Sequence, residues 1–104
     1  MTTENNYKRK LLTVVTESAL ENSLIHEVEA LGATGYTITD ARGKGSRGRR
    51  DAGWETNSNI RVDIICNEEL AISISKHLQK KFYDNYAMII FVSDTEVLRL
   101  DKFQ

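Results

Sequence analysis

A strand–helix–strand pattern occurs twice in this sequence of 104 residues, and this repetition limits the fold more than any other feature. In the first half, residues 11–16 and 35–40 have strand character and flank a segment with apolar residues at helical spacing. In the second half, residues 60–66 and 87–92 flank a second helical segment in the same way. The chain is therefore predicted to consist of two similar halves.

The two predicted helices have recognisable end signals. The first is expected to begin at Ser18, where Glu21 completes a capping-box pattern, and to end at Gly32. The second is expected to be capped by Asn67 and to run to Phe82. This order predicts one α+β domain, 1–104, with a ferredoxin-like β-α-β-β-α-β sandwich and a long loop between strands 2 and 3. Both helices would then cover one face of a four-stranded antiparallel sheet.

The fourth predicted strand is apolar on both of its faces, with Ala87, Ile89 and Phe91 on one and Met88, Ile90 and Val92 on the other. Strands that are buried on both faces have this pattern. Two helices on one side of the sheet leave the other side uncovered, so we expect the chain to self-associate through that side. A turn at residues 93–95 and a short last strand at residues 96–99 are expected to follow.

The composition is that of a soluble globular domain, with 40% hydrophobic and 28% charged residues. A flexible, polar N-terminal segment is expected at residues 1–9, and it is too polar for a signal peptide. The single cysteine, Cys66, excludes an internal disulfide, fits a reducing cytoplasm and is expected to be a buried, inert thiol. His26 and His77 are expected on solvated helix faces, and no metal site is expected.

Residues 41–54, ARGKGSRGRRDAGW, hold four of the six glycines and five of the fourteen basic residues. Glycine lets backbone N–H groups turn toward a ligand, and arginine presents a planar fork that matches phosphate or carboxylate oxygens. The segment lacks the Gly-Lys-Ser/Thr ending of a Walker A loop. We expect a backbone nest for an anion without catalytic groups, formed by Gly43, Lys44, Gly45, Ser46, Arg47, Gly48 and Arg50.

Other functions are less compatible with the sequence. An RNA-recognition motif has this topology but needs base-stacking aromatic residues on its central strands, and residues 11–16 and 60–66 have none. A net charge of −1 also argues against a protein that binds nucleic acid over a broad surface. No nucleophile–base pair is apparent. Two alternatives stay open: a nucleic-acid-binding module that uses the arginine loop, and a small nucleotide hydrolase.

Several short motifs, in this order and spacing, resemble the PII signalling superfamily. They are GATGYT at 32–37, GKGSR at 43–47 with Arg50 beyond it, FYDNYAMII at 82–90 and EVL at 96–98. The resemblance covers residues 11–98 and is closest to the PII-like proteins of the SbtB type and the carboxysome-associated PII type. It implies a cytoplasmic, non-enzymatic homotrimer that binds an adenine nucleotide (ADP, AMP, ATP or cAMP) in clefts between subunits. Residues 42–59 would be the T-loop, which contacts the target.

The resemblance also implies roles for individual residues. Lys44, Gly45, Ser46, Arg47 and Arg50 would face the phosphate or ribose, Asp63 and Ile65 the adenine edge, and backbone groups of Tyr86, Ala87, Met88 and Ile89 the cleft. Arg49 and Trp54 would belong to a partner contact or a loop switch. The implied target is a membrane bicarbonate transporter or a carboxysome component, and bicarbonate is a further candidate ligand. The chain lacks the T-loop tyrosine of conventional PII proteins and the terminal Cys-Gly-Pro-x-Gly-Cys segment of many SbtB proteins.

Overall fold

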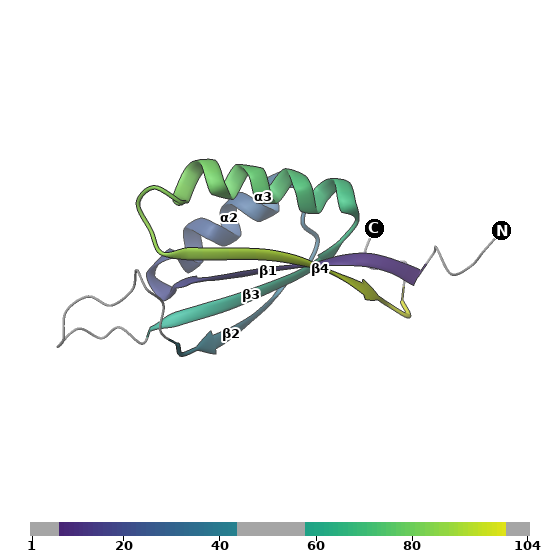
Figure 1. Cartoon of the computed structure of the whole chain (residues 1–104), viewed down its shortest axis with the longest axis horizontal. Coiled ribbons are helices and arrows are strands. Elements are labelled where there is room, and N and C mark those ends of the chain that lie inside the picture. The colour runs from purple at the N-terminus through teal and green to yellow at the C-terminus, as the bar shows by residue number, and fades with distance from the viewer. Residues whose placement is uncertain (1–6, 44–57, 100–104) are drawn as a thin grey trace.

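The computed structural model of the chain describes residues 7–43 and 58–99. Seven elements follow one another along these residues: β1 (Lys8–Glu17), η1 (Ser18–Leu20), α2 (Glu21–Leu31), β2 (Thr37–Ala41), β3 (Asn59–Cys66), α3 (Glu68–Phe82) and β4 (Met88–Glu96). The four strands form one antiparallel sheet in the order β2-β3-β1-β4. Both helices lie on the same side of this sheet (Figure 1). The predicted ferredoxin-like α+β fold is confirmed.

The hydrophobic core lies between the sheet and the two helices. In β3, Ile60, Val62 and Ile64 alternate with less buried residues, as expected for a strand that has one face on the core. Ile74 and Leu78 of α3 are fully buried against this face, because they lie four residues apart on one side of the helix. The core also contains Leu12, Val14, Leu20, Leu24, Val28, Ala33, Cys66, Ala71, Phe82 and Met88.

Three of the predicted helix ends are confirmed. The Asn67 side chain caps α3, since its Oδ1 accepts a hydrogen bond from the Leu70 backbone N–H at 2.8 Å. The helix continues to Phe82, as predicted. At the end of α2, Gly32 has a φ of 119°, which is in the left-handed region, and its N–H donates to the Glu29 carbonyl at 3.0 Å. A residue with a side chain would be strained in this conformation.

The predicted start of the first helix is wrong. Ser18 begins a short 3₁₀ turn, and the α-helix starts only at Glu21. The Ser18 hydroxyl does not cap this helix, because it donates to the backbone carbonyl of Ser58 at 3.0 Å. The Ser18 backbone N–H donates to the same carbonyl at 2.9 Å. A contact between residues 40 positions apart has therefore replaced the local capping box.

The predicted turn at residues 93–95 is also wrong, and so is the separate strand at 96–99. β4 continues through these residues to Glu96, because β1 begins at Lys8, three residues earlier than predicted, and provides a longer partner. Lys8 is opposite Glu96 and Lys10 is opposite Asp94, with which it forms an ion pair. Lys8 and Arg9, which were expected in a flexible N-terminal segment, are thus part of the sheet.

The two helices are joined through Glu27 of α2, by a hydrogen bond with His77 and an ion pair with Lys81. Its Oε1 lies 2.6 Å from His77 Nε2 and its Oε2 lies 3.1 Å from Lys81 Nζ, both on α3. The expectation that His77 is only solvated is therefore wrong. The hydrogen bond from His77, followed by that from Lys81, lowers the pKa of the Glu27 carboxyl below its ordinary value of 4.5.

The Glu27 contacts predict a pH-dependent contribution to stability. A carboxyl whose pKa is lower in the folded state stabilises the fold above its unfolded pKa, and this contribution is lost as the pH falls through the folded pKa. We expect Glu27→Gln to lower the Tm by a few degrees at pH 7. The difference from the wild type should shrink as the pH falls below about 4.5, the ordinary value. Thermal denaturation of both proteins from pH 7 to pH 3 measures this difference in Tm. A difference that is as large at pH 3 as at pH 7 would refute the stabilising role of the ionised Glu27 carboxylate.

Candidate functional site

The sheet face opposite the helices is not covered by any element of the described residues (Figure 1). On β4, Ile89 and Phe91 point to this open face and are 57% and 44% exposed, whereas Met88 is buried in the core. The strand register places further apolar residues on the same face, namely Leu11, Val15 and Ile65. The expectation that β4 presents apolar residues on both sides therefore agrees with the burial of Met88 and the exposure of Ile89 and Phe91.

A polar network crosses the middle of this open face. The Thr13 hydroxyl, which is fully buried, donates to Asp63 Oδ1 at 2.8 Å. Arg61 Nε donates to Asp63 Oδ2 at 3.1 Å, and the Arg61 guanidinium carbon lies 6.0 Å from the centre of the Phe91 ring. Asp63, which the resemblance to PII proteins places at an adenine edge, is thus fixed by two residues of its own chain. Arg61 and Thr13 were not predicted as site residues.

The two ends of the glycine- and arginine-rich loop meet at one end of the sheet. Ala41, the last residue of β2, is paired with Asn59, the first residue of β3. Gly43 is exposed, and a Cβ added to it would have no other atom within 4 Å, so this position has room for a ligand or a partner. The other predicted residues of this loop lie outside the described residues: Lys44, Gly45, Ser46, Arg47, Gly48, Arg49, Arg50 and Trp54.

The turn before β4 lies at this same end of the sheet. The Phe82 carbonyl accepts hydrogen bonds from the N–H groups of Asn85 at 3.1 Å and Tyr86 at 3.0 Å. The rings of Phe82 and Tyr86 make an edge contact, with 5.9 Å between their centres. Ala87 is held through its backbone: its N–H donates to Glu17 Oε2 at 3.3 Å, and its carbonyl accepts from Thr16 Oγ1 at 3.0 Å.

The structure brings together part of the predicted site. Asp63, Ile65 and Ile89 share the open face, and Tyr86 and Ala87 lie at the end of the sheet where the loop begins. The Met88 side chain faces the core, so only its backbone can line a cleft on the open side. Thr16 and Glu17, which hold Ala87, were missed. Their position beside Ala87 depends on strand pairing and has no local sequence signal.

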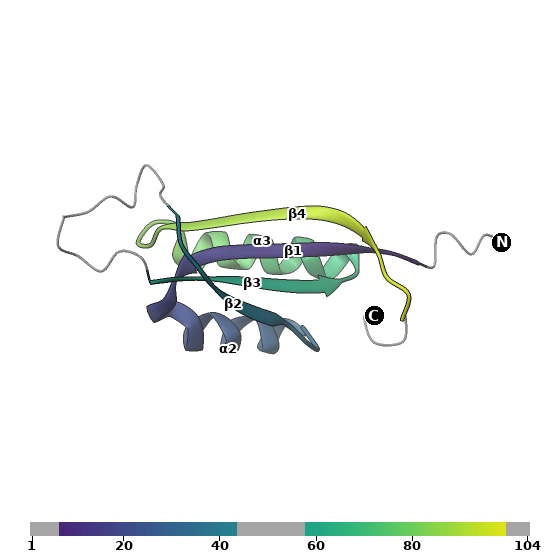
Figure 2. The ribbon, with the colours of Figure 1, turned by 90° about the horizontal axis from the view of Figure 1, so that it is seen from below.

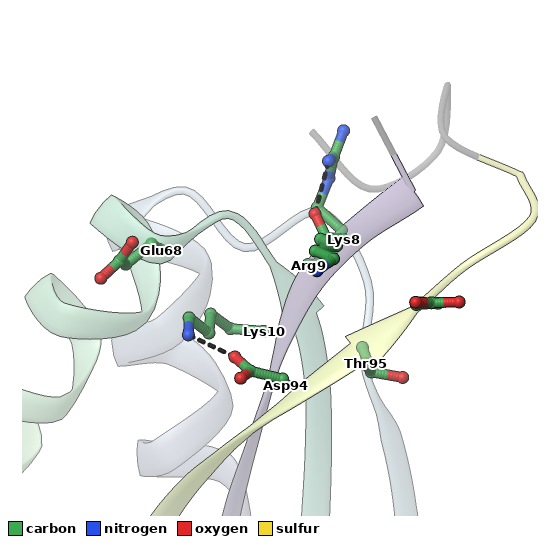
Figure 3. Close-up of a pocket in the computed structure, with 7 residues that line it drawn as sticks. Lys8, Arg9, Lys10, Glu68, Asp94 and Thr95 are labelled. Atoms are coloured by element: carbon green, nitrogen blue, oxygen red, sulfur yellow. Dashed lines mark hydrogen bonds and ion pairs between the residues drawn. The ribbon is translucent and has the colours of Figure 1, made fainter. Parts of the chain in front are cut away.

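A cavity of about 470 Å³ lies at the other end of the sheet (Figure 3). It is lined by three basic residues of β1, by acidic residues of α3 and β4 and by one threonine, namely Lys8, Arg9, Lys10, Glu68, Asp94, Glu96 and Thr95. The hydrogen bond with Asp94 raises the pKa of Lys10, and the same contact lowers the pKa of Asp94. Because the charges here compensate one another and no predicted residue is involved, this cavity is separate from the candidate site.

Two further features concern the chemistry of the described residues. Cys66 is buried, as predicted, and this burial raises the pKa of its thiol, which makes the reactive thiolate scarce. Across residues 7–43 and 58–99, histidine, cysteine and acidic side chains do not gather in groups of three that could hold a metal ion. Within these ranges, neither helix has the length and apolar character that a membrane crossing requires.

Comparison with known proteins identifies the class to which this fold and site belong. The family model of the nitrogen regulatory protein P-II matches residues 9–102. The chain therefore belongs to the P-II nitrogen regulatory protein family, and the resemblance to PII proteins is confirmed at that level.

Solved structures of PII-like proteins are similar to this chain over nearly its whole length. A PII-like signaling protein from Thermus thermophilus is 47% identical, with a TM-score of 0.80, over 94% of this chain and 97% of that one. CPII from Thiomonas intermedia, bound to ADP, AMP and acetate, is 28% identical, with a TM-score of 0.80, over 93% of this chain and 95% of that one. CPII bound to ADP and bicarbonate is 28% identical, with a TM-score of 0.80, over 94% of this chain and 96% of that one.

Proposed function

We propose that this protein is a non-enzymatic regulator that binds an adenine nucleotide between the subunits of a homotrimer. The observation that carries this proposal is the similarity of almost the whole chain to CPII, whose structures contain ADP, AMP and small anions. Membership of the P-II family supports a regulatory role. ADP and AMP are therefore the first nucleotides to test, ahead of ATP and cAMP.

The geometry supports a site between subunits. Ile89 and Phe91 leave apolar surface exposed on the open face, and association of copies through this face would remove that surface from water. Asp63, Ile65 and Ile89, to which the resemblance to PII proteins gives a role in nucleotide binding, lie on the same face. A cleft at the edge of such an interface would be bounded by the turn before β4 and by the loop base at Gly43. Lys44, Arg47 and Arg50 would then reach the phosphates.

A small planar anion is the second ligand in this proposal. Structures of CPII are bound to acetate or to bicarbonate, which both present two oxygens in a plane. The arginine-rich loop offers planar guanidinium groups that match such an anion in a bidentate way. We therefore infer that the protein is of the SbtB or carboxysome-associated type and senses bicarbonate together with the nucleotide. Its target would be a bicarbonate transporter or a carboxysome component in the cytoplasm, contacted by residues 42–59 with Arg49 and Trp54.

Calorimetric titration of the purified chain with ADP, AMP, ATP and cAMP, each with and without bicarbonate, tests this function. We expect saturable binding of ADP or AMP, with an affinity that bicarbonate changes by several fold through a shared loop. ATP should be recovered unchanged after incubation. Absence of binding by all four nucleotides would refute the proposal, and turnover of ATP would favour the nucleotide hydrolase. Binding of RNA or DNA that weakens strongly with salt, without nucleotide binding, would favour the nucleic-acid module.

A further inference from the structure

The C-terminal end of β1 contacts both the turn before β4 and the beginning of β3. On one side, the Thr16 hydroxyl and the Glu17 carboxylate hold the two backbone groups of Ala87, at 3.0 and 3.3 Å. On the other side, the backbone N–H and the hydroxyl of Ser18 both donate to the Ser58 carbonyl, at 2.9 and 3.0 Å. Residues 16–18 are called the β1 corner below.

The position of the β1 corner follows from the order of the strands. β1 lies between β3 and β4, and all three run side by side to the same end of the sheet (Figure 2). Thr16 is paired with Met88 of β4, and Glu17 is paired with Asn59 of β3. β3 and β4 are therefore not paired with each other, and the C-terminal end of β1 lies between their first residues.

These hydrogen bonds connect Ala87 to Ser58 through the β1 corner. Both backbone groups of Ala87 are satisfied by the corner, and a backbone N–H or carbonyl that loses its partner away from water is costly. Thr16 is 2% exposed, so its hydroxyl has little access to replacement water. A shift of Ala87 must therefore either break these bonds or move the corner. Because Ser18 directly follows Glu17, movement of the corner changes both bonds to Ser58.

We propose that the β1 corner couples the backbone at Ala87 to the beginning of β3 at Ser58. Thr16, Glu17 and Ser18 act as positioning residues, since they would affect a bound nucleotide only through Ala87 and Ser58. A ligand that binds against residues 86–89 then changes the order of the backbone at residues 58–60, from which the loop departs. The role of the ligand rests on the proposed function, but the link itself is a property of the free protein. Coupling between two sites is reciprocal, so the start of β3 also influences Ala87.

Hydrogen-exchange mass spectrometry of the full chain tests this link without any ligand. In Ser18→Ala, one of the two bonds to Ser58 is lost, whereas the direct contacts of Ala87 with Thr16 and Glu17 are kept. We expect the amides of residues 87–89 to exchange roughly two- to fivefold faster than in the wild type, as for partial loss of one hydrogen bond. Ser23→Ala, on the exposed side of α2, is the matched control and should leave these amides unchanged. A merely structural Ser18 would change exchange near Ser58 alone, and that result would overturn the proposal.

ADP provides the second arm of the experiment. In the wild type and in Ser23→Ala, ADP should slow exchange at residues 58–60, and in Ser18→Ala this protection should be largely lost, with ADP affinity reduced about fivefold. If the wild type binds ADP but residues 58–60 do not respond, the coupling is refuted. If the wild type does not bind ADP, the proposed function fails. The exchange at residues 87–89 in the free protein still decides whether the β1 corner couples Ala87 to Ser58.

Discussion

Phe91→Glu should convert the proposed trimer into monomers and abolish measurable ADP binding. Phe91 lies on the open face of β4 beside Arg61 and is 44% exposed in the single chain. A carboxylate placed there would have to be buried on association, and burying a charge without full compensation costs several kcal/mol. Since each 1.4 kcal/mol changes an equilibrium about tenfold, dissociation and a loss of about 100-fold or more in ADP affinity are expected. Light scattering and calorimetry measure the two effects.

Ile72→Glu is the matched control for this prediction. Ile72 is 47% exposed, similar to Phe91, but it lies on α3, on the helical side of the sheet. Because that side is away from the open face, Ile72→Glu should stay trimeric and should bind ADP as the wild type does. A trimeric Phe91→Glu variant with unchanged ADP affinity would show that the open face of the sheet is not the interface.

Arg47→Ala and Arg50→Ala should each weaken ADP binding by roughly ten- to a hundredfold. This range corresponds to the loss of one charge-assisted contact, typically about 1.5–3 kcal/mol. In the absence of ligand we expect the Tm to be nearly unchanged, because the phosphates that these two arginines are proposed to bind are then absent. Calorimetry with ADP and with AMP measures the change. Arg47→Lys should restore binding only in part, since lysine keeps the charge but lacks the planar fork.

Arg99→Ala is the control for the two loop arginines. Arg99 is exposed and lies two residues after Val97, whose N–H donates to the Tyr7 carbonyl at 2.8 Å at the other end of the sheet. Its removal changes the net charge by the same amount but should leave the affinity for ADP unaltered. If all three alanine variants weaken binding equally, the effect is one of overall charge, and the phosphates are not bound at Arg47 and Arg50.

The features of the fold that depend on neighbouring residues could be predicted from the sequence. The Asn67 cap, the Gly32 end and the alternation of Ile60, Val62 and Ile64 are set by residues within one turn or one strand. Predictions failed where a distant partner decided the outcome, as for His77, which contacts Glu27. Ser18 bonds to Ser58 in place of its own helix, and pairing with residues 9–11 of β1 keeps β4 extended through residues 93–95.

The candidate site could be predicted only where its residues are placed by the local alternation of a strand. Side-chain alternation along β3 and β4 is sufficient to place Asp63, Ile65 and Ile89 on one face once the sheet is known. The contacts of Ala87 with Thr16 and Glu17 join residues about 70 positions apart, and they depend on the register of β1 with β4. Neither a threonine nor a glutamate at the end of a strand is a signal for such a role.

Native mass spectrometry of the wild-type chain with ADP tests the central claim most directly, because it counts chains and nucleotides in the same particle. Binding between subunits predicts an assembly of three times 11.8 kDa that carries up to three ADP molecules, and a monomer without bound ADP. The same measurement on Phe91→Glu should show the bare monomer alone. A wild-type monomer that carries ADP, or a trimer that remains empty at saturating ADP, would contradict a nucleotide site built from neighbouring subunits.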